Sequence, residues 1–184
     1  MLFVFIGSAA IETAEAAQIV LDVPVRKTMV PLNVTHTAIV TREIQRKILS
    51  PDSAEDEETT PLPPAASPLR HMLSTLVSFF AARYRAVFGF LRGPPIHDAL
   101  TIAYVAHPGM FAWRRFRVDV ELNGQHTVGE TVVDVWDYRK SDDTWGKTGK
   151  NCYVTDSINV RLSYSILSSP YTIYSRWTTS SVWF

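Results

Sequence analysis

The 184-residue sequence has one cysteine, no long apolar run and no net charge. With Cys152 alone, the chain cannot form an internal disulfide, which fits a reducing compartment. No stretch approaches the ~20 consecutive apolar residues that a membrane span needs, so we expect no membrane partner. A formal net charge of zero gives no overall attraction to nucleic acid, and we expect no nucleic-acid partner. These absences favour a single cytoplasmic domain.

Several common catalytic patterns are also missing from the sequence. It contains no phosphate-binding glycine loop, no zinc-ligand spacing and no nucleophile elbow. Cys152 has no neighbour that would promote a thiolate apart from Lys150, so a packing role is favoured. Any chemistry therefore has to come from less conspicuous residues.

The first 50 residues read as alternating helices and strands. The pattern predicts a short helix over residues 15–24, a buried strand over 25–34 and an amphipathic helix over 41–49. Pro31 indicates that the strand lies at a sheet edge or ends early. Open α/β sheets bind ligands beyond the carboxyl ends of their strands. Three polar residues fall at that place: Asn33, Thr35 and His36.

Residues 50–67 change character abruptly. Acidic residues between Asp52 and Glu58 are followed by four prolines from Pro61 to Pro68, with almost nothing to bury. Such a composition does not offset the entropy lost on ordering, so we expect a disordered acidic and proline-rich insertion. A solvated loop is the favoured interpretation over an acidic docking site.

A long helix follows the insertion. Ser67-Pro68 is a typical helix start, and the pattern predicts a helix from there to about Val87. Apolar residues at intervals of three and four predict one packed face: Leu69, Met72, Leu73, Leu76 and Phe80. Gly89 and Gly93 then bracket a turn into a second helix over residues 96–105.

The remaining chain is predicted to contain a β-hairpin near residues 116–136. Residues 116–122 alternate apolar and charged, as a half-exposed strand does, and 127–136 can return as the partner strand. Asn123-Gly124 between them is the strongest short hairpin signal. After Trp145 the sequence has no clear period, and we expect residues 161–184 to form an irregular tail.

His97 and Asp98, at the start of the predicted 96–105 helix, are the leading site candidates. Taken alone, Asp98 is explained as an acid that complements the helix dipole, with His97 as its neighbour. Tyr84 lies close upstream with Phe79 and Phe80, and an aromatic wall suits a stacked base, although core packing also explains Tyr84. Asn33 is a candidate polar contact or a side chain that satisfies backbone groups at a strand end.

Several blocks in order resemble the C-terminal half of the inosine-uridine preferring nucleoside hydrolases. The resemblance runs from about residue 15 to 160 and rests on these blocks: Glu15-Ala16-Ala17, Pro31–His36, Phe79–Leu100, Val118–Leu122 and Gly129–Asp134. It implies a partial domain over residues 1–160 with the C-terminal portion of a Rossmann-like α/β fold. It also implies a nucleoside substrate, N-glycosidic bond cleavage and a calcium cofactor.

Carried over to this sequence, the resemblance makes His97 the leaving-group acid and Asp98 a calcium ligand. Histidine suits the acid role because its pKa lies near neutrality. Tyr84 and Asn33 would contact substrate.

The sequence also departs from the family pattern. The Asp-rich run that supplies most calcium carboxylates has no match here, and Gly7 and Ala9 occupy ribose-recognition positions. Calcium takes six to eight oxygen ligands, so we expect no tight calcium site in this chain. We therefore predict a truncated form that is catalytically incomplete by itself. The alternative is a non-catalytic interaction module, which forms a homo-oligomer or pairs with an intact homologue.

Overall fold

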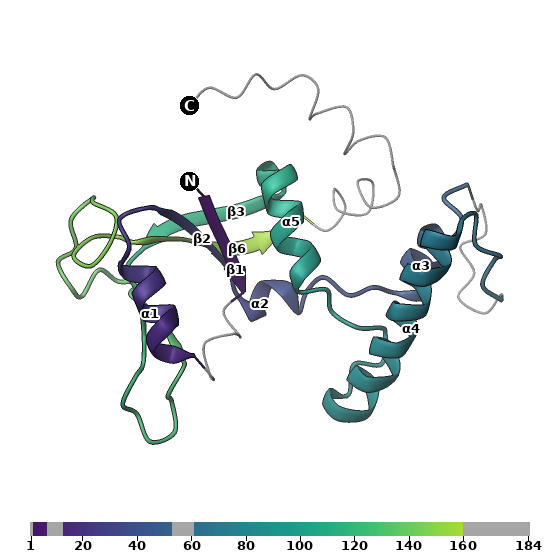
Figure 1. Cartoon of the computed structure of the whole chain (residues 1–184), viewed down its shortest axis with the longest axis horizontal. Helices are drawn as coiled ribbons and strands as arrows, with labels where there is room; N and C mark the ends of the chain where they lie inside the picture. Colours follow the sequence, from purple (N-terminus) through teal and green to yellow (C-terminus); the bar gives the residue numbers. More distant parts are fainter. Residues whose placement is uncertain (1, 7–12, 53–60, 160–184) are drawn as a thin grey trace. The chain divides into compact units, whose positions relative to one another are not determined.

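The computed structural model describes residues 2–6, 13–52 and 61–159, which form two compact units (Figure 1). Unit 1 combines Met1–Thr37 with His97–Ile158, and unit 2 contains Ala38–Ile96. Within these described ranges we find no helix with both the length and the hydropathy needed to cross a bilayer.

Unit 1 is built on a four-stranded sheet in the order β1-β2-β6-β3 (Figure 1). The strands are β1 (Leu2–Ile6), β2 (Arg26–Val30), β3 (Phe111–Phe116) and β6 (Cys152–Ile158). β1, β2 and β6 run parallel, and β3 is antiparallel to β6. Helix α1 (Ala14–Asp22) lies between β1 and β2 in sequence, because adjacent parallel strands need a crossover connection. The α/β class expected from the sequence is confirmed, as is a short helix near residues 15–24.

β2 ends at Val30, although the pattern predicts a strand to residue 34. Pro31 has extended backbone and precedes a single helical turn, α2 (Leu32–Thr35). Proline has no N–H to donate to a strand ladder, so the strand stops there. The expectation that Pro31 ends the strand early is confirmed. The alternative of an edge position is wrong, because β2 lies between β1 and β6.

Helix α5 (Asp98–Ala106) and the short 3-10 helix η2 (Pro108–Met110) lead into β3. The helix ends before Pro108 as predicted, but it begins at Asp98 rather than at residue 96. Leu100 and Tyr104 are its buried residues. The Tyr104 hydroxyl accepts a hydrogen bond from Thr28 Oγ1 at 3.3 Å, which ties α5 to β2.

The core of unit 1 lies among α1, β2, β4 (Val118–Val120) and β6. A buried amide next to β6 links α1 and β4: Asn151 accepts from the N–H of Val118 at 2.8 Å and donates to the carbonyls of Val118 (2.8 Å) and Leu21 (3.2 Å). The predicted packing role of Cys152 is confirmed, since its side chain is fully buried. Burial raises the pKa of the Cys152 thiol to about 12, and the nearby cation that opposes this shift is Lys27. The buried apolar set is Ala14, Leu21, Met29, Val118, Val120, Cys152 and Val154.

The predicted hairpin is present as β4 (Val118–Val120) paired with antiparallel β5 (Thr131–Val133). Its strands are shorter than the 116–136 pattern suggests, and Phe116 belongs to β3. The Glu121 carboxylate accepts hydrogen bonds from the N–H groups of Asn123 (2.8 Å) and Gly124 (3.0 Å). The Asn-Gly pair therefore belongs to the longer loop that joins β4 to β5.

Unit 2 contains α3 (Arg42–Leu49) and α4 (Pro68–Phe88). Ser67 caps α4 by accepting a hydrogen bond from the N–H of Arg70 at 3.3 Å, and Gly89 ends the helix at φ 74°. The predicted helices at 41–49 and 67–87 are confirmed, because their capping signals are local. The two helices meet through Gln45, whose amide donates to the hydroxyls of Ser74 (3.0 Å) and Ser78 (2.7 Å).

The apolar face of α4 is exposed, and the expectation that it is packed is wrong. The residues concerned are Leu69, Met72, Leu73, Leu76 and Phe80. The periodicity identifies an apolar face correctly, but α4 contacts α3 through its serine side. Residues 53–60 of the predicted insertion and the predicted tail over 161–184 lie outside the described residues. Residues 61–67 are described, and the Arg46 guanidinium donates to the carbonyl of Pro61 at 2.9 Å.

Candidate functional site

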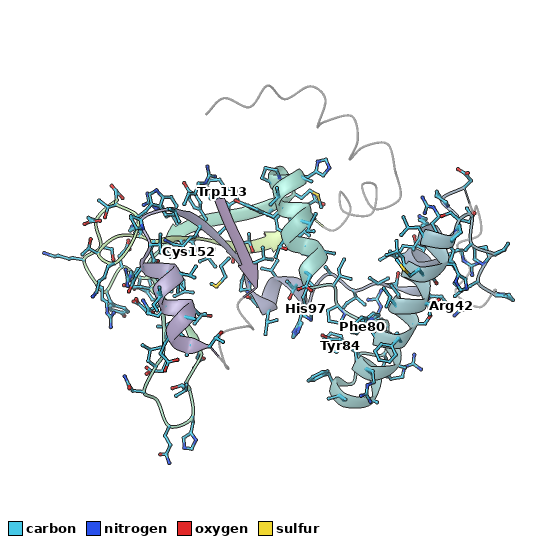
Figure 2. All side chains as sticks on the ribbon, in the orientation of Figure 1. Arg42, Phe80, Tyr84, His97, Trp113 and Cys152 are labelled. Atoms are coloured by element: carbon cyan, nitrogen blue, oxygen red, sulfur yellow. The ribbon has the colours of Figure 1, made fainter. Side chains whose placement is uncertain are left out.

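His97 is positioned by the helix that it precedes and by the turn after β2. It directly precedes α5, which packs beside β1, and its ring lies half-buried (Figure 2). Buried Leu100 and Tyr104 anchor the helix. The side chain of His97 is therefore presented from a fixed helix start.

The turn that follows β2 contacts this histidine. The Thr35 hydroxyl lies 2.8 Å from Nδ1 of His97, and the Thr35 side chain is completely buried. The ring of His36 meets that of His97 edge-on, with centroids 5.4 Å apart at 62°. Thr35 and His36 thus both contact His97, the predicted acid. The sequence predicts that these two residues follow the carboxyl end of a strand.

Burial lowers the pKa of His97 below its ordinary value of 6.5. The neighbouring His36 lowers it further, and Asp98 partly opposes both effects. Removing an imidazolium from water disfavours the charged form, and so does a second imidazole beside it. His97 therefore favours the neutral state, and when it is protonated it is a stronger acid than an exposed histidine.

Asp98 begins α5, and its side chain is exposed. Across residues 2–6, 13–52 and 61–159, no group of three or more His, Cys, Asp or Glu side chains is arranged to hold a metal. The groups described around the neighbouring His97 are the imidazole of His36 and the hydroxyl of Thr35, whereas calcium prefers several carboxylate and carbonyl oxygens. This donor set does not fit calcium without further oxygen ligands.

The other two predicted site residues, Asn33 and Tyr84, lie in two different units. Asn33 lies in α2 with its side chain exposed, in the same turn as Thr35 and His36. Tyr84 lies on α4, in unit 2 (Figure 2). Its ring contacts Phe88 at 5.4 Å and Phe90 at 5.7 Å between centroids. The aromatic group expected from the sequence exists within unit 2, but these contacts do not connect it to His97.

The direct contacts of Thr35 and His36 with His97 were not predicted from the sequence. The sequence does place Thr35 and His36 at the carboxyl end of β2, where ligands bind in such sheets. This position does not indicate that their contact is with His97. The sequence separation between Thr35 and His97 is 62 residues, so no local pattern links them.

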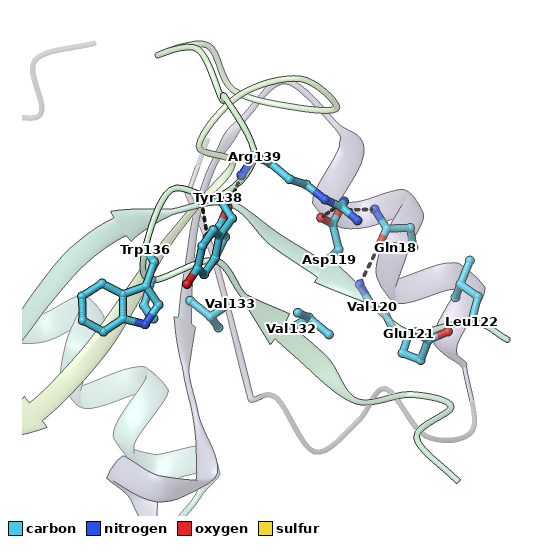
Figure 3. Close-up of a pocket in the computed structure, with 12 residues that line it drawn as sticks. Gln18, Asp119, Val120, Glu121, Leu122, Val132, Val133, Trp136, Tyr138 and Arg139 are labelled. Atoms are coloured by element: carbon cyan, nitrogen blue, oxygen red, sulfur yellow. Dashed lines mark hydrogen bonds and ion pairs between the residues drawn. The ribbon is translucent and has the colours of Figure 1, made fainter. Parts of the chain in front are cut away.

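A separate groove of about 630 Å³ lies against the β4–β5 hairpin (Figure 3). Gln18 borders it and accepts a hydrogen bond from the N–H of Val120 at 2.7 Å. The Asp119 carboxylate there pairs with Arg139 at 3.2 Å. The rim carries the exposed rings of Trp136 and Tyr138. None of the predicted site residues lines this groove.

A family model and two similar known proteins all carry the description of a nucleoside hydrolase. The family model described as inosine-uridine preferring nucleoside hydrolase matches residues 13–164. A probable ribonucleoside hydrolase of Dictyostelium discoideum is 33% identical over 146 residues, which is 79% of this chain and 38% of that protein. The inosine-uridine preferring nucleoside hydrolase of Crithidia fasciculata is 31% identical over 65% of this chain and 33% of its own length.

Solved structures agree on the fold. The purine-preferring ribonucleoside hydrolase from Gardnerella vaginalis superimposes with a TM-score of 0.65 at 18% identity. The superposition covers 88% of this chain and 44% of that one. The chain thus spans less than half of the length of each protein compared.

Proposed function

The chain belongs to the inosine-uridine preferring nucleoside hydrolase family, and from this premise we propose that it serves the hydrolysis of a ribonucleoside to free base and ribose. His97 is the leaving-group acid of that reaction. The observation that carries the proposal is the position of this histidine. It lies at the start of α5, next to Asp98, and contacts the turn at the carboxyl end of β2.

In the proposed reaction the C–N glycosidic bond breaks and its electron pair leaves with the base. A ring nitrogen of the base takes a proton from His97, and water adds its hydroxyl to the anomeric carbon while releasing the other proton. Positive charge develops on the ribose, as in other glycoside hydrolyses. Protonation removes the developing negative charge on the base, and the lowered pKa of His97 strengthens it as the donor.

The described residues around Asp98 do not provide the oxygen ligands that calcium needs. Asp98 is proposed as one ligand, and the other carboxylates must come from residues outside those described or from a second polypeptide. The chain by itself is accordingly proposed to be catalytically incomplete. A single, buried thiol fits a cytoplasmic location.

The acid role is tested by varying the leaving group. Base release from inosine, from uridine and from 4-nitrophenyl riboside is measured with and without calcium. For the two nucleosides, His97→Ala should slow whatever residual release the incomplete chain supports by about 100-fold or more, the contribution typical of a general acid. The nitrophenyl riboside needs no proton on its leaving group and should be slowed far less. Asp98→Ala should remove any dependence on calcium.

His126, on the exposed loop between β4 and β5, offers a matched control. His126→Ala should leave every rate unchanged. Equal slowing of all three substrates by His97→Ala would contradict the acid role. No release from any substrate, together with no binding of nucleoside, would favour the second candidate function.

The second candidate is a non-catalytic interaction module that pairs with an intact homologue or with itself. The observation that favours it is the exposed apolar face of α4, which includes Leu69, Phe79 and Phe80. Sedimentation of the chain, alone and mixed with an intact homologue, separates the two candidates. Association that Phe80→Glu abolishes supports the module. A chain that remains monomeric in both samples contradicts it.

A further inference from the structure

Thr35, in the α2 turn, is in direct polar contact with the proposed acid. Its hydroxyl makes two contacts, one of 2.8 Å to Nδ1 of His97 and one of 3.2 Å to the carbonyl oxygen of Leu32. The side chain is completely buried, and Thr35 N–H bonds the carbonyl of Pro31 at 3.1 Å. Packing and backbone bonding thus fix this hydroxyl beside Nδ1 of His97.

A hydroxyl carries one proton, so the two contacts constrain each other. If that proton goes to Nδ1 of His97, the Leu32 contact has no hydrogen between its two oxygens. If it goes to the Leu32 carbonyl, the hydroxyl lone pair accepts from Nδ1–H, and both contacts are hydrogen bonds. The second arrangement satisfies more groups in a buried place, where an unmade hydrogen bond is costly.

The second arrangement also suits an acid. An imidazolium has N–H groups on both nitrogens and cannot accept a hydrogen bond. A Thr35 hydroxyl directed at the Leu32 carbonyl accepts from Nδ1–H whether the ring is charged or neutral. The hydroxyl then does not have to rotate when the ring gives up its other proton.

We propose that Thr35 is a positioning residue that holds His97 in the Nδ1–H form, so that Nε2 is the nitrogen that delivers the proton. The catalytic consequence rests on the proposed function, whereas the tautomer itself does not. His36 meets the same ring edge-on and helps to fix its plane.

The tautomer is read by ¹⁵N–¹H NMR of the uniformly ¹⁵N-labelled 184-residue chain, at an alkaline pH where the ring is neutral. The His97 signals are identified by their loss in His97→Gln. We expect a protonated, pyrrole-type nitrogen at Nδ1 and a pyridine-type nitrogen at Nε2. Free imidazole side chains in water prefer the opposite form, so the result is diagnostic. Finding the Nε2–H form in the unaltered chain would overturn the proposal without any variant.

Substitutions then assign the effect to the hydroxyl. Thr35→Val keeps the shape and removes the acceptor, and His97 should revert toward the Nε2–H form. Thr35→Ser should preserve the Nδ1–H form. Thr37→Val is the matched control, because Thr37 makes the same kind of bond, 2.6 Å to the Val34 carbonyl, as Thr35 makes to Leu32. An unchanged tautomer in folded Thr35→Val would overturn the proposal.

The outcome separates this inference from the proposed function. An Nδ1–H ring in a chain that neither binds nor cleaves nucleosides would uphold the role of Thr35 and contradict the function. An Nε2–H ring in a chain whose turnover requires His97 would contradict the role of Thr35 and uphold the proposed function. Where turnover is measurable, Thr35→Val should lower kcat by less than His97→Ala does, because the acid is still present, and should leave KM close to its original value.

Discussion

Buried polar side chains determine much of the detail of unit 1, and Arg117 is a clear case. Its side chain is nearly buried, and its guanidinium donates to the Asp119 carboxylate and to the carbonyl of Gly146 at 2.9 Å. Hydrogen bonding to Asp119 raises the pKa of Arg117 despite the opposing effect of burial. The cation therefore joins β4 to the loop before β6.

Arg117→Met should lower the free energy of unfolding by about 1–3 kcal/mol, since it leaves the buried carbonyl of Gly146 without its donor and removes the ion pair with the half-buried Asp119 carboxylate. Lys47→Met is the control, because Lys47 pairs with Glu43 at the surface of α3. That variant should change stability by no more than about 0.5 kcal/mol. Urea unfolding measures both, and equal losses would show that the Arg117 network contributes little.

The Cys152 thiol predicts a pH dependence of stability. An unfolded thiol ionises near its ordinary value of 9.0, whereas the buried thiol keeps its proton to about pH 12. Between these values the folded state binds more protons, so the free energy of unfolding should fall as pH rises. The slope attributable to this group is about 1.4 kcal/mol per pH unit. Cys152→Ala should lack this contribution when both proteins are unfolded in urea at pH 9 and pH 11.

At the scale of elements, local signals predicted helix ends well and strand pairing poorly. Ser67 and Gly89 bound α4 where the sequence indicates, because caps and left-handed glycines act within a few residues. β1, β3 and β6 were not predicted as strands. β6 pairs with β2 through Thr28 and Tyr153, and these residues are so far apart in sequence that no short-range pattern indicates the partner.

The residues of the candidate site were predicted from the sequence, but the contact between them was not. Family resemblance pointed to His97 and Asp98, and the strand-end argument pointed to Thr35 and His36. The contact between Thr35 and His97 depends on how α5 packs beside the sheet, which no short-range pattern encodes.

Two glycines that flank the turn before α5 give a prediction about elements. Gly89 (φ 74°) has open space around it, so Gly89→Ala should cost about 1–2 kcal/mol for the left-handed backbone alone. At Gly93 (φ 140°) an added methyl group would lie 2.0 Å from the carbonyl oxygen of Val40. Gly93→Ala should therefore cost clearly more, because the Val40 backbone must move. Thermal unfolding compares the two variants, and a smaller loss at Gly93 would contradict the packing described here.

The whole molecule belongs to a nucleoside hydrolase family, but its described residues provide an incomplete set of calcium ligands. The chain shares the family's sequence and fold over most of its length, yet it spans 38% of the Dictyostelium discoideum relative. His97 has the surroundings of a proton donor, and Asp98 stands beside it without a carboxylate cluster in the described ranges. The central claim is that this chain supplies the leaving-group acid but not a complete calcium site.

Calorimetric titration of the folded 184-residue chain with calcium, with and without inosine, tests this claim most directly. We expect no saturable heat in either titration, because a single carboxylate does not provide the oxygen ligands that calcium needs. Saturable binding that Asp98→Ala abolishes would contradict it, and would mean that the chain assembles the remaining ligands by itself.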